Sequence, residues 1–175
     1  MRIVLFRHGP AGPRDASRWP DDLARPLTEE GAERTRRAAR GVACLEPGVR
    51  KVFASPALRT LASARLLSEA LELHGEPEVL SSLAPDGVWR ETLKQLSREA
   101  EDANVALVGH EPGLGVLAAS LLLSAEVNAL SFKKAGACAI ECDVPELGRG
   151  RLRWWLRPAA LRAMRPHKNK KGRVG

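Results

Sequence analysis

The chain has 175 residues, of which 28 are lysine or arginine and 21 are aspartate or glutamate, and these give a net charge of +7 and a sequence pI near 9.9. Hydrophobic residues make up 44% of the chain, as in ordinary globular domains, and the length is typical of one domain. No apolar run approaches the roughly 20 residues that a membrane-spanning helix needs, and the short apolar start has no signal-peptide cleavage site. These features exclude a transmembrane protein and predict a single globular domain.

The three cysteines, Cys44, Cys138 and Cys142, are too few and odd in number for a disulfide framework. Cys138 and Cys142 stand four residues apart on an expected strand. An extended strand separates such positions by roughly 13 Å, which is beyond the reach of a disulfide. We therefore expect reduced core cysteines and a cytoplasmic location.

The excess positive charge is concentrated at the end of the chain. Residues 162–175 hold six lysines or arginines and no acid, whereas residues 1–161 hold 22 basic and 21 acidic residues. We expect a domain over residues 1–161 and a disordered tail over 162–175, because the tail has no apolar periodicity. Such a tail is either a solvated end or a weak contact for an anion, such as RNA or an acidic protein. It does not by itself indicate a nucleic-acid-binding domain.

Short apolar runs alternate with helical patterns over the first two thirds of the chain. The continuous apolar residues at 3–6 are typical of a strand that is buried on both faces of a sheet. Thr28 before two glutamates predicts one helix N-terminus, and Ser55 before a proline predicts another. In chain order we expect a strand at 2–6, a loop at 9–26, a helix at 29–45, a strand at 51–54, a helix from 56 with apolar positions to 73, a helix at 88–101, a strand at 105–108 and a helix at 114–123.

The last third of the chain changes character. Residues 129–132, 138–144 and 151–156 are expected to be strands joined by glycine-containing turns. The alternation of strands and helices predicts an α/β fold, a three-layer α/β/α sandwich with a mostly parallel central sheet. The final hairpin predicts an antiparallel edge at the C-terminal side of that sheet.

Three polar motifs come directly after three of the expected strands. They are RHG at 7–9, SPALRT at 55–60 and GHEPG at 109–113. The carboxyl ends of parallel strands meet at one edge of a sheet, and ligands bind at that edge in open α/β folds. We therefore expect the three motifs to converge.

The side chains of these motifs suit a phosphoryl group. Arg7 and Arg59 can grip phosphate oxygens in a bidentate way, and nearby helix N-termini add free N–H groups. His8 and His110 supply two imidazoles, and a neutral imidazole can be the nucleophile in phosphoryl transfer. The sequence therefore predicts a phosphoryl-transfer site.

Taken together, the motifs resemble the signature of the histidine phosphatase superfamily, which is also called phosphoglycerate-mutase-like. RHG at 7–9 resembles its first motif, SPALRT at 55–60 its second phosphate-binding motif, and GH at 109–110 its second histidine. PLTEEG at 26–31 is similar to the segment after the first loop in that family. The short middle region and the final WxxxPxxL at 154–161 most resemble the SixA-type phosphohistidine phosphatases, so the resemblance covers nearly the whole chain before the tail.

The resemblance implies a phosphoglycerate-mutase-like fold and roles for the matched positions. His8 would attack phosphorus and carry a phosphohistidine intermediate, which water then hydrolyses. Arg7, Arg59 and His110 would surround the equatorial oxygens and stabilise negative charge in the transition state. The resemblance implies no metal and no cofactor, and neither histidine has an acidic or thiol neighbour at metal-ligand spacing.

A carboxylic acid for the leaving group is not evident. Larger relatives supply one from a longer segment before the second histidine. Here 50 residues separate Arg59 from His110, and Asp86 and Glu91 are the available carboxylates near the expected loop. An imidazole leaving group needs less help than an alkoxide, because its conjugate acid has a pKa of about 6.5. This favours a phosphoramidate substrate such as protein phosphohistidine.

Other polar residues near the motifs have two interpretations each. Glu111 is either a general base or, as we favour, an acid at a helix entry. Arg25 either reaches a substrate or, as we expect, is an exposed charge before a proline. Ser55 is expected to be a helix cap, since no nucleophile-elbow motif surrounds it. The loop at 15–22, with Arg14 beside it, either lines the mouth of the site and selects the substrate or is a mobile surface loop.

The expected function is metal-independent hydrolysis of phosphohistidine on a signalling or phosphotransfer protein, through phospho-His8. Two alternatives stay open at this point. One is a phosphatase of a small phosphate monoester with the same fold, and the other is a catalytically silent module that binds an anionic partner. The expected partner is thus a phosphorylated protein or small molecule, and neither a membrane nor a nucleic acid.

Overall fold

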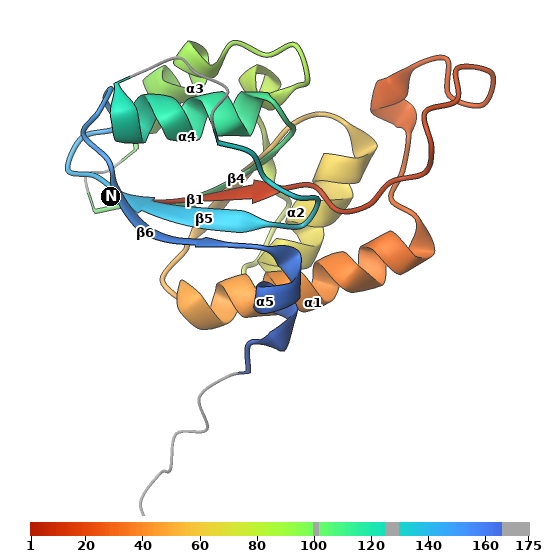
Figure 1. Cartoon of the computed structure of the whole chain (residues 1–175), viewed down its shortest axis with the longest axis horizontal. Coiled ribbons are helices and arrows are strands. Elements are labelled where there is room, and N and C mark those ends of the chain that lie inside the picture. The colour runs from red at the N-terminus through yellow and green to blue at the C-terminus, as the bar shows by residue number, and fades with distance from the viewer. Residues whose placement is uncertain (100–101, 125–129, 166–175) are drawn as a thin grey trace, which may run out of the picture.

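The computed structural model describes residues 1–99, 102–124 and 130–165 (Figure 1). A six-stranded sheet in the order β3-β2-β4-β1-β5-β6 forms its centre, with helices on both faces. The strands are β1 (Arg2–Arg7), β2 (Lys51–Ala54), β3 (Glu78–Val79), β4 (Asn104–Gly109), β5 (Ala137–Glu141) and β6 (Arg151–Leu156). The helices are α1 (Glu29–Leu45), α2 (Leu58–Ala70), α3 (Trp89–Leu96), α4 (Gly113–Leu123) and α5 (Pro158–Ala163), with 3₁₀ turns η1 (Asp22–Ala24) and η2 (Ser81–Leu83).

β1 sets the register of the sheet. It pairs in parallel with β4, so that Arg7 lies opposite Gly109, and antiparallel with β5 on its other side. β2 and β3 continue the parallel half, and β6 pairs antiparallel with β5. The expected α/β fold, with a mostly parallel sheet and an antiparallel C-terminal edge, is confirmed.

The side chains of β1 alternate between two cores. Val4 and Phe6 pack in the core on the side of α1, α2 and α5, whereas Ile3 and Leu5 pack in the core on the side of α3 and α4. All four are fully buried. Because both faces of the strand are covered, its sequence is continuously apolar rather than alternating.

Several expected elements have other bounds in the structure, and the strand expected at 138–144 is β5, which ends at Glu141. Two further differences have a visible cause. α3 ends at Leu96 rather than at 101, and the carboxylate of Glu99 instead accepts from Lys51 Nζ at 3.0 Å; residues 100–101 lie outside the described residues. The strand expected at 129–132 is absent over 130–132, and residue 129 is not described. There the N–H and C=O of Phe132 bind the side chains of Glu111 and Arg7, so they are not available for a strand ladder.

The C-terminal end of the described chain packs on α1. A Cβ at Gly41 would lie 2.1 Å from the carbonyl oxygen of Leu161, so this glycine lets α5 approach α1 closely. The side chain of Leu161 is fully buried. α5 continues two residues past the domain boundary expected at Leu161, and the basic segment 166–175 lies outside the described residues.

The remaining predictions about the fold concern cysteines and membranes. Cys138 and Cys142 are fully buried core residues, as expected, and Cys44 is partly exposed. Among the described helices, none has the length and apolar character that crossing a bilayer requires.

Candidate active site

The three motifs meet at the carboxyl ends of β1, β2 and β4. The backbone N–H of His8 donates to the carbonyl of Gly109 at 3.1 Å. The backbone N–H of Ser55 donates to the carbonyl of Val108 at 3.0 Å. This register brings the ring centroids of His8 and His110 to 5.0 Å from each other. The predicted convergence of the motifs is therefore found in the structure.

His8 is a neutral imidazole with one free nitrogen. Its Nδ1 lies 2.7 Å from the carbonyl oxygen of Gly9, and since a carbonyl can only accept, Nδ1 carries the proton and Nε2 the lone pair. Burial, together with the charges of Arg59 and Arg7, lowers the pKa of His8 to about 3, although the hydrogen bond with Gly9 acts in the opposite direction. A nucleophilic imidazole needs this neutral form.

Gly9 allows the loop after β1 to lie against two helices. A Cβ at this position would lie 1.8 Å from Thr35 Oγ1 of α1. The N–H of Gly9 donates to Ser63 Oγ of α2 at 3.0 Å. A larger residue would push the loop away from α1 and would move His8 with it.

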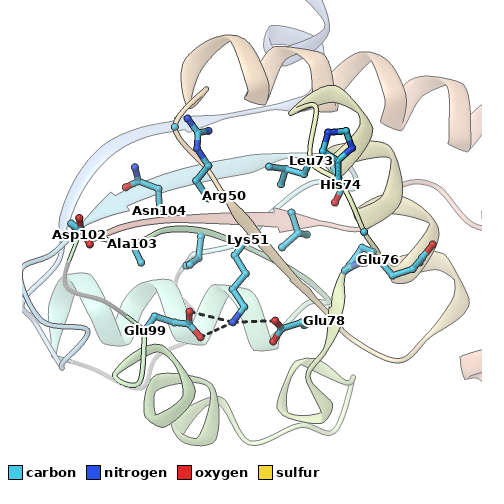
Figure 2. A pocket seen from close by; sticks show the side chains of 16 residues that line it. Arg50, Lys51, Leu73, His74, Glu76, Glu78, Glu99, Asp102, Ala103 and Asn104 are labelled. Carbon is cyan, nitrogen blue, oxygen red and sulfur yellow. Dashed lines mark hydrogen bonds and ion pairs between the residues drawn. The ribbon is translucent and has the colours of Figure 1, made fainter.

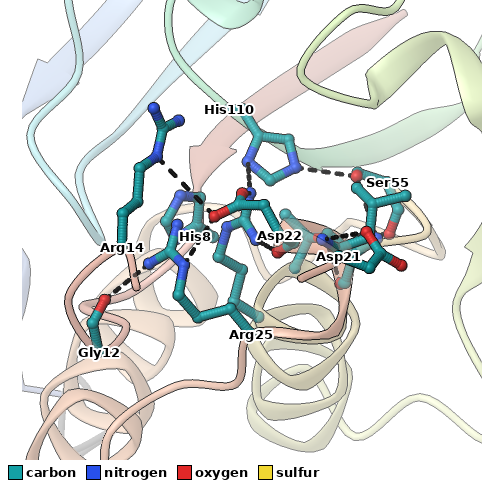
Figure 3. Close-up of polar contacts among 12 residues, drawn as sticks. His8, Gly12, Arg14, Asp21, Asp22, Arg25, Ser55 and His110 are labelled. Atoms are coloured by element: carbon teal, nitrogen blue, oxygen red, sulfur yellow. Dashed lines mark hydrogen bonds and ion pairs between the residues drawn. The ribbon is translucent and has the colours of Figure 1, made fainter. Parts of the chain in front are cut away.

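His110 is oriented by Ser55. Nε2 of His110 lies 2.9 Å from Ser55 Oγ, and its Nδ1 lies 3.5 Å from Arg59 Nη2 (Figure 3). Since a guanidinium only donates, Nδ1 holds the lone pair and Nε2–H donates to the serine. Burial, with smaller contributions from His8 and Arg59, lowers the pKa of His110 to about 3. The expectation that Ser55 caps the following helix is wrong, because α2 begins at Leu58 with Ala57 as its cap residue.

The two arginines of the motifs keep unused donors in buried positions. Arg59 is 1% exposed; its Nη1 donates to the backbone carbonyl of Asp22 at 2.6 Å, and its Nη2 pairs with the Asp22 carboxylate at 2.9 Å. Arg7 donates through Nη1 to the carbonyl of Phe132. The Nε–H groups of both arginines are buried and have no acceptor. The oxygens of a bound phosphoryl group are suitable acceptors for such donors.

These side chains surround a pocket of about 350 Å³. Its residues come from the loop after β1, the start of α2, the segment around 85 and the segments after β4 and before β5. They are Arg7, His8, Ala11, Gly12, Pro13, Arg14, Arg25, Arg59, Pro85, His110, Glu111 and Lys134. Five of these side chains are cationic and one is acidic, which makes the pocket suited to an anion.

Arg25 is buried, although it was expected to be an exposed charge. Only 6% of it is exposed, because its guanidinium turns into the pocket. Its Nη1 donates to the carbonyl of Gly12 at 2.8 Å and its Nε to the carboxylate of Asp22 at 2.9 Å. The two contacts join the ends of the loop at 12–22.

Glu111 lines the pocket but does not cap α4. Its Oε1 accepts from the backbone N–H of Phe132 at 2.7 Å, which ties the segment before β5 to the end of β4. Burial raises the pKa of Glu111, while this hydrogen bond and the charge of Arg7 oppose the shift. Glu111 and Arg7 thus bind the backbone N–H and the backbone C=O of the same residue, Phe132.

Asp86 and Glu91 lie outside the pocket of the histidines. Both line a neighbouring hollow between η2 and α3, and Glu91 pairs with Lys94 at 2.7 Å on the surface. Pro85, one residue before Asp86, is the residue of this segment that lines the pocket of the two histidines.

Sequence reasoning missed three contributors to the site: Ser55 as a partner of His110, Asp22 as a partner of Arg59, and Lys134. The spacing of Asp22 and Arg25, three residues apart, is compatible with their ion pair and was the one available signal. Lys134 follows a segment expected to be a strand, and no local pattern distinguishes it from an ordinary surface lysine.

A larger pocket at the opposite edge of the sheet has a different character (Figure 2). It lies at the amino ends of β2 and β4, where Lys51 Nζ pairs with Glu78 at 3.1 Å and with Glu99 at 3.0 Å. Four acidic side chains line this pocket beside Arg50 and Lys51, so it is less suited to an anion than the pocket of the two histidines. Within the described part of the chain, no group of three or more His, Cys, Asp or Glu side chains is arranged to hold a metal ion.

Comparison with known proteins gives consistent results. The sequence model of the histidine phosphatase superfamily (branch 1) matches residues 3–84. An uncharacterized protein of Picosynechococcus sp. is 37% identical over 138 residues, which cover 78% of this chain and 82% of that protein. The phosphohistidine phosphatase SixA of Escherichia coli K12 is 29% identical over 165 residues, which cover 93% of this chain and 97% of SixA.

Solved structures agree on the fold. The protein histidine phosphatase SixA in complex with tungstate superimposes with a TM-score of 0.79 at 26% identity, covering 92% of this chain and 99% of that one. The phosphohistidine phosphatase SixA proposed for Agrobacterium tumefaciens gives a TM-score of 0.70 at 21% identity, covering 90% and 97%. With its two histidines and two arginines at the carboxyl edge of the sheet, the chain belongs to the histidine phosphatase superfamily and is SixA-like in sequence and fold.

Proposed function

We propose that this protein is a phosphohistidine phosphatase that works through a covalent phosphoryl group on His8. The observation that carries the proposal is the free Nε2 lone pair of His8 inside a pocket that also presents Arg7, Arg59 and His110. Similarity to SixA over nearly the whole chain supports the choice of substrate class.

In the first step Nε2 of His8 attacks the phosphorus of the substrate. A new P–N bond forms, the P–N bond of the substrate phosphohistidine breaks, and its electron pair goes to the leaving imidazole nitrogen, which takes a proton from water. Arg7 and Arg59 hold the equatorial oxygens, and their unused Nε–H donors lie in buried positions, where electrostatic stabilisation is strong. The carbonyl of Gly9 stabilises the proton on Nδ1 as positive charge develops on His8.

In the second step water attacks the phosphorus of phospho-His8. The P–N bond to His8 breaks and its electron pair returns to Nε2, while the attacking water releases one proton to solvent, which replaces the proton taken up in the first step. The products are inorganic phosphate and the free imidazole. The position of His110, 5.0 Å from His8 between ring centroids, lets it contact the same phosphoryl group throughout.

A phosphoramidate suits the acid groups of the pocket. Asp22 is ion-paired with Arg59. The hydrogen bond from Arg25 lowers the pKa of Asp22, and so does the positive charge of Arg59, so its carboxyl group is ionised and a poor acid. The carboxylate of Glu111 is bound to Phe132. An imidazole leaving group accepts a proton near neutral pH, whereas an alkoxide needs a positioned acid.

A second candidate is hydrolysis of a small phosphate ester that itself carries a second negatively charged group. It is favoured by Lys134 and Arg14, which line the pocket at its exposed side and can pair with such a group. The two candidates differ in the leaving group and not in the role of His8.

The test is a panel of a phosphohistidine protein, a sugar phosphate and an aryl phosphate, without added metal. We expect the highest kcat/KM on phosphohistidine and an acid-labile, alkali-stable label on His8. His8→Ala should abolish both turnover and label, and His74→Ala, at an exposed histidine outside the pocket, should change neither. A higher kcat/KM on the sugar phosphate would support the second candidate, and full activity of His8→Ala would refute the nucleophile.

A further inference from the structure

We propose that Asp22 is a specificity-determining carboxylate that occupies the phosphoryl-binding guanidinium of Arg59 in the free protein and gives way to an incoming dianion. This inference rests on the proposed phosphoryl site but concerns how the site selects and releases its ligand. It assigns a function to the loop at 12–22, which the mechanism above leaves unused.

The carboxylate of Asp22 is held as an anionic ligand would be held. Oδ2 lies 2.9 Å from Arg59 Nη2, and Oδ1 lies 2.9 Å from Arg25 Nε and 3.8 Å from Arg14 Nε (Figure 3). All three arginines line the pocket that contains the two histidines. The carboxylate therefore engages the cations that a phosphoryl group would need.

The free pocket requires such a counter-charge. Arg59 is almost completely buried, and a buried charge without a partner is strongly destabilising. Five cationic side chains line the pocket, and its one lining acid, Glu111, lies beside Arg7. Asp22 supplies the negative charge for Arg59, Arg25 and Arg14.

A phosphoryl dianion and this carboxylate compete for Arg59. Two negative groups that share one guanidinium repel each other, so the dianion binds best when Asp22 moves off Nη2. The carboxylate can move at small cost in packing: its side chain is 39% exposed, and residues 13–18 of the loop before it are all exposed. The hydrogen bond from Arg25 to the carbonyl of Gly12 does not involve the carboxylate and can persist.

Two consequences follow for the ligand. A dianionic phosphoryl group has the charge to replace a carboxylate on Arg59, whereas a monoanion gains little by the exchange. After hydrolysis the return of Asp22 to Arg59 favours release of inorganic phosphate. Asp22 thus weakens the binding of phosphate, and it thereby favours dianions over monoanions and speeds the release of the product.

The test measures binding of inorganic phosphate to the full-length protein by calorimetry at neutral pH. Asp22→Asn keeps the size of the side chain and removes its charge, and we expect phosphate to bind about tenfold more tightly, since one close like charge is removed. In steady state with an aryl phosphate, KM and the inhibition constant of phosphate should fall together, while kcat should not rise. Asp22→Ser, a second neutral variant, should shift binding in the same direction.

Asp21→Asn is the matched control. It removes the same charge one residue earlier, where the Asp21 carboxylate accepts from the N–H of Leu23 at 2.8 Å, a bond that asparagine can keep. We expect it to change phosphate affinity by less than about twofold, because exposed charges are screened.

The outcomes separate this inference from the proposed function. If wild type binds phosphate and both Asp22 variants bind it equally or more weakly, Asp22 only positions Arg59 and the competition is refuted. A large loss of kcat on an aryl ester, with unchanged phosphate affinity, would instead identify Asp22 as a proton donor and would also refute it. If wild type itself binds no phosphate, the phosphoryl site fails together with the inference.

Discussion

At the scale of single residues, hydrogen bonds fix the proton positions of both imidazoles. Gly9 accepts from Nδ1 of His8, and Ser55 accepts from Nε2 of His110, so each ring has a defined lone pair. Burial then keeps both rings neutral, with pKa values of about 3. His8 is therefore a free nucleophile, and His110 is a second imidazole that gains a proton only when a negatively charged phosphoryl group binds.

These pKa values predict a pH dependence of stability. Above pH about 6.5 both histidines are neutral in the folded and the unfolded chain, and their contribution to stability is complete. As pH falls from there toward 3, the unfolded chain binds protons that the folded chain does not, so the free energy of unfolding decreases by about 1.4 kcal/mol per pH unit for each histidine.

Urea unfolding between pH 7.5 and 5 measures this slope. His8→Asn should remove the contribution of one histidine and flatten the slope, and His74→Asn, at an exposed histidine, should leave it as in wild type. Equal slopes for wild type and His8→Asn would show that His8 is protonated in the folded protein.

Glu111 has a structural contribution that its substitution can reveal. Glu111→Ala leaves the buried N–H of Phe132 without its acceptor, which we expect to cost about 1–3 kcal/mol of unfolding free energy. Glu111→Gln retains an acceptor oxygen and should cost clearly less. If both variants cost the same by thermal or urea unfolding, charge rather than the hydrogen bond supports this segment.

At the scale of elements, glycines set how closely the layers approach. Gly9 brings the loop after β1 against Thr35 of α1, and Gly41 brings α5 against the other end of the same helix. α1 is thus the support for the loop of the nucleophile and for the C-terminal helix. Its packing links the end of the described chain to the stability of the site.

Leu161→Ala tests the contribution of α5. Its side chain is fully buried between the helices and the sheet, so the truncation should lower the free energy of unfolding by about 2–5 kcal/mol. Leu152→Ala on β6 is the matched control, because 49% of that leucine is exposed, and its cost should be under about 1 kcal/mol. A loss below that limit for Leu161→Ala would mean that α5 packs only loosely.

At the scale of the whole molecule, the uneven charge separates into two features. The strongly basic segment 166–175 follows α5, which packs on α1 and contributes no residue to the pocket lining. The pocket itself gathers five cations from an almost neutral body. The net charge of the chain and the charge of the site therefore have different origins.

Removal of residues 166–175 tests that separation. The truncated chain keeps α5 and loses four lysines or arginines. We expect kcat/KM on an aryl phosphate to stay within about twofold of wild type, because α5, which precedes this segment in the chain, contributes no residue to the pocket lining. A tenfold loss would place this segment at the active site, whereas a loss confined to a phosphoprotein substrate would assign it to partner binding.

Much of this molecule could be predicted from local patterns. The apolar run predicted β1, and Thr28 predicted the start of α1. Because each motif directly follows an expected strand, Arg7, His8, Arg59 and His110 were expected at one edge of the sheet. The cap assigned to Ser55 and the exposed charge assigned to Arg25 were wrong, because Ser55 turns toward His110 and Arg25 turns into the pocket. Ser55 contacts His110 across 55 positions, and no periodicity reports such a contact.

The sequence by itself determined the fold class, the family and the two histidine–arginine motifs. A strand that is buried on both faces has a continuous apolar run, and the motif residues follow such runs directly in the sequence, so both can be recognised locally. Only the tertiary structure decided which nitrogen of His8 is free, how far burial lowers the pKa values, and that Asp22 occupies Arg59. These properties depend on hydrogen bonds and charges between separate elements. They are set by the register of the sheet and the path of one loop, which local patterns do not encode.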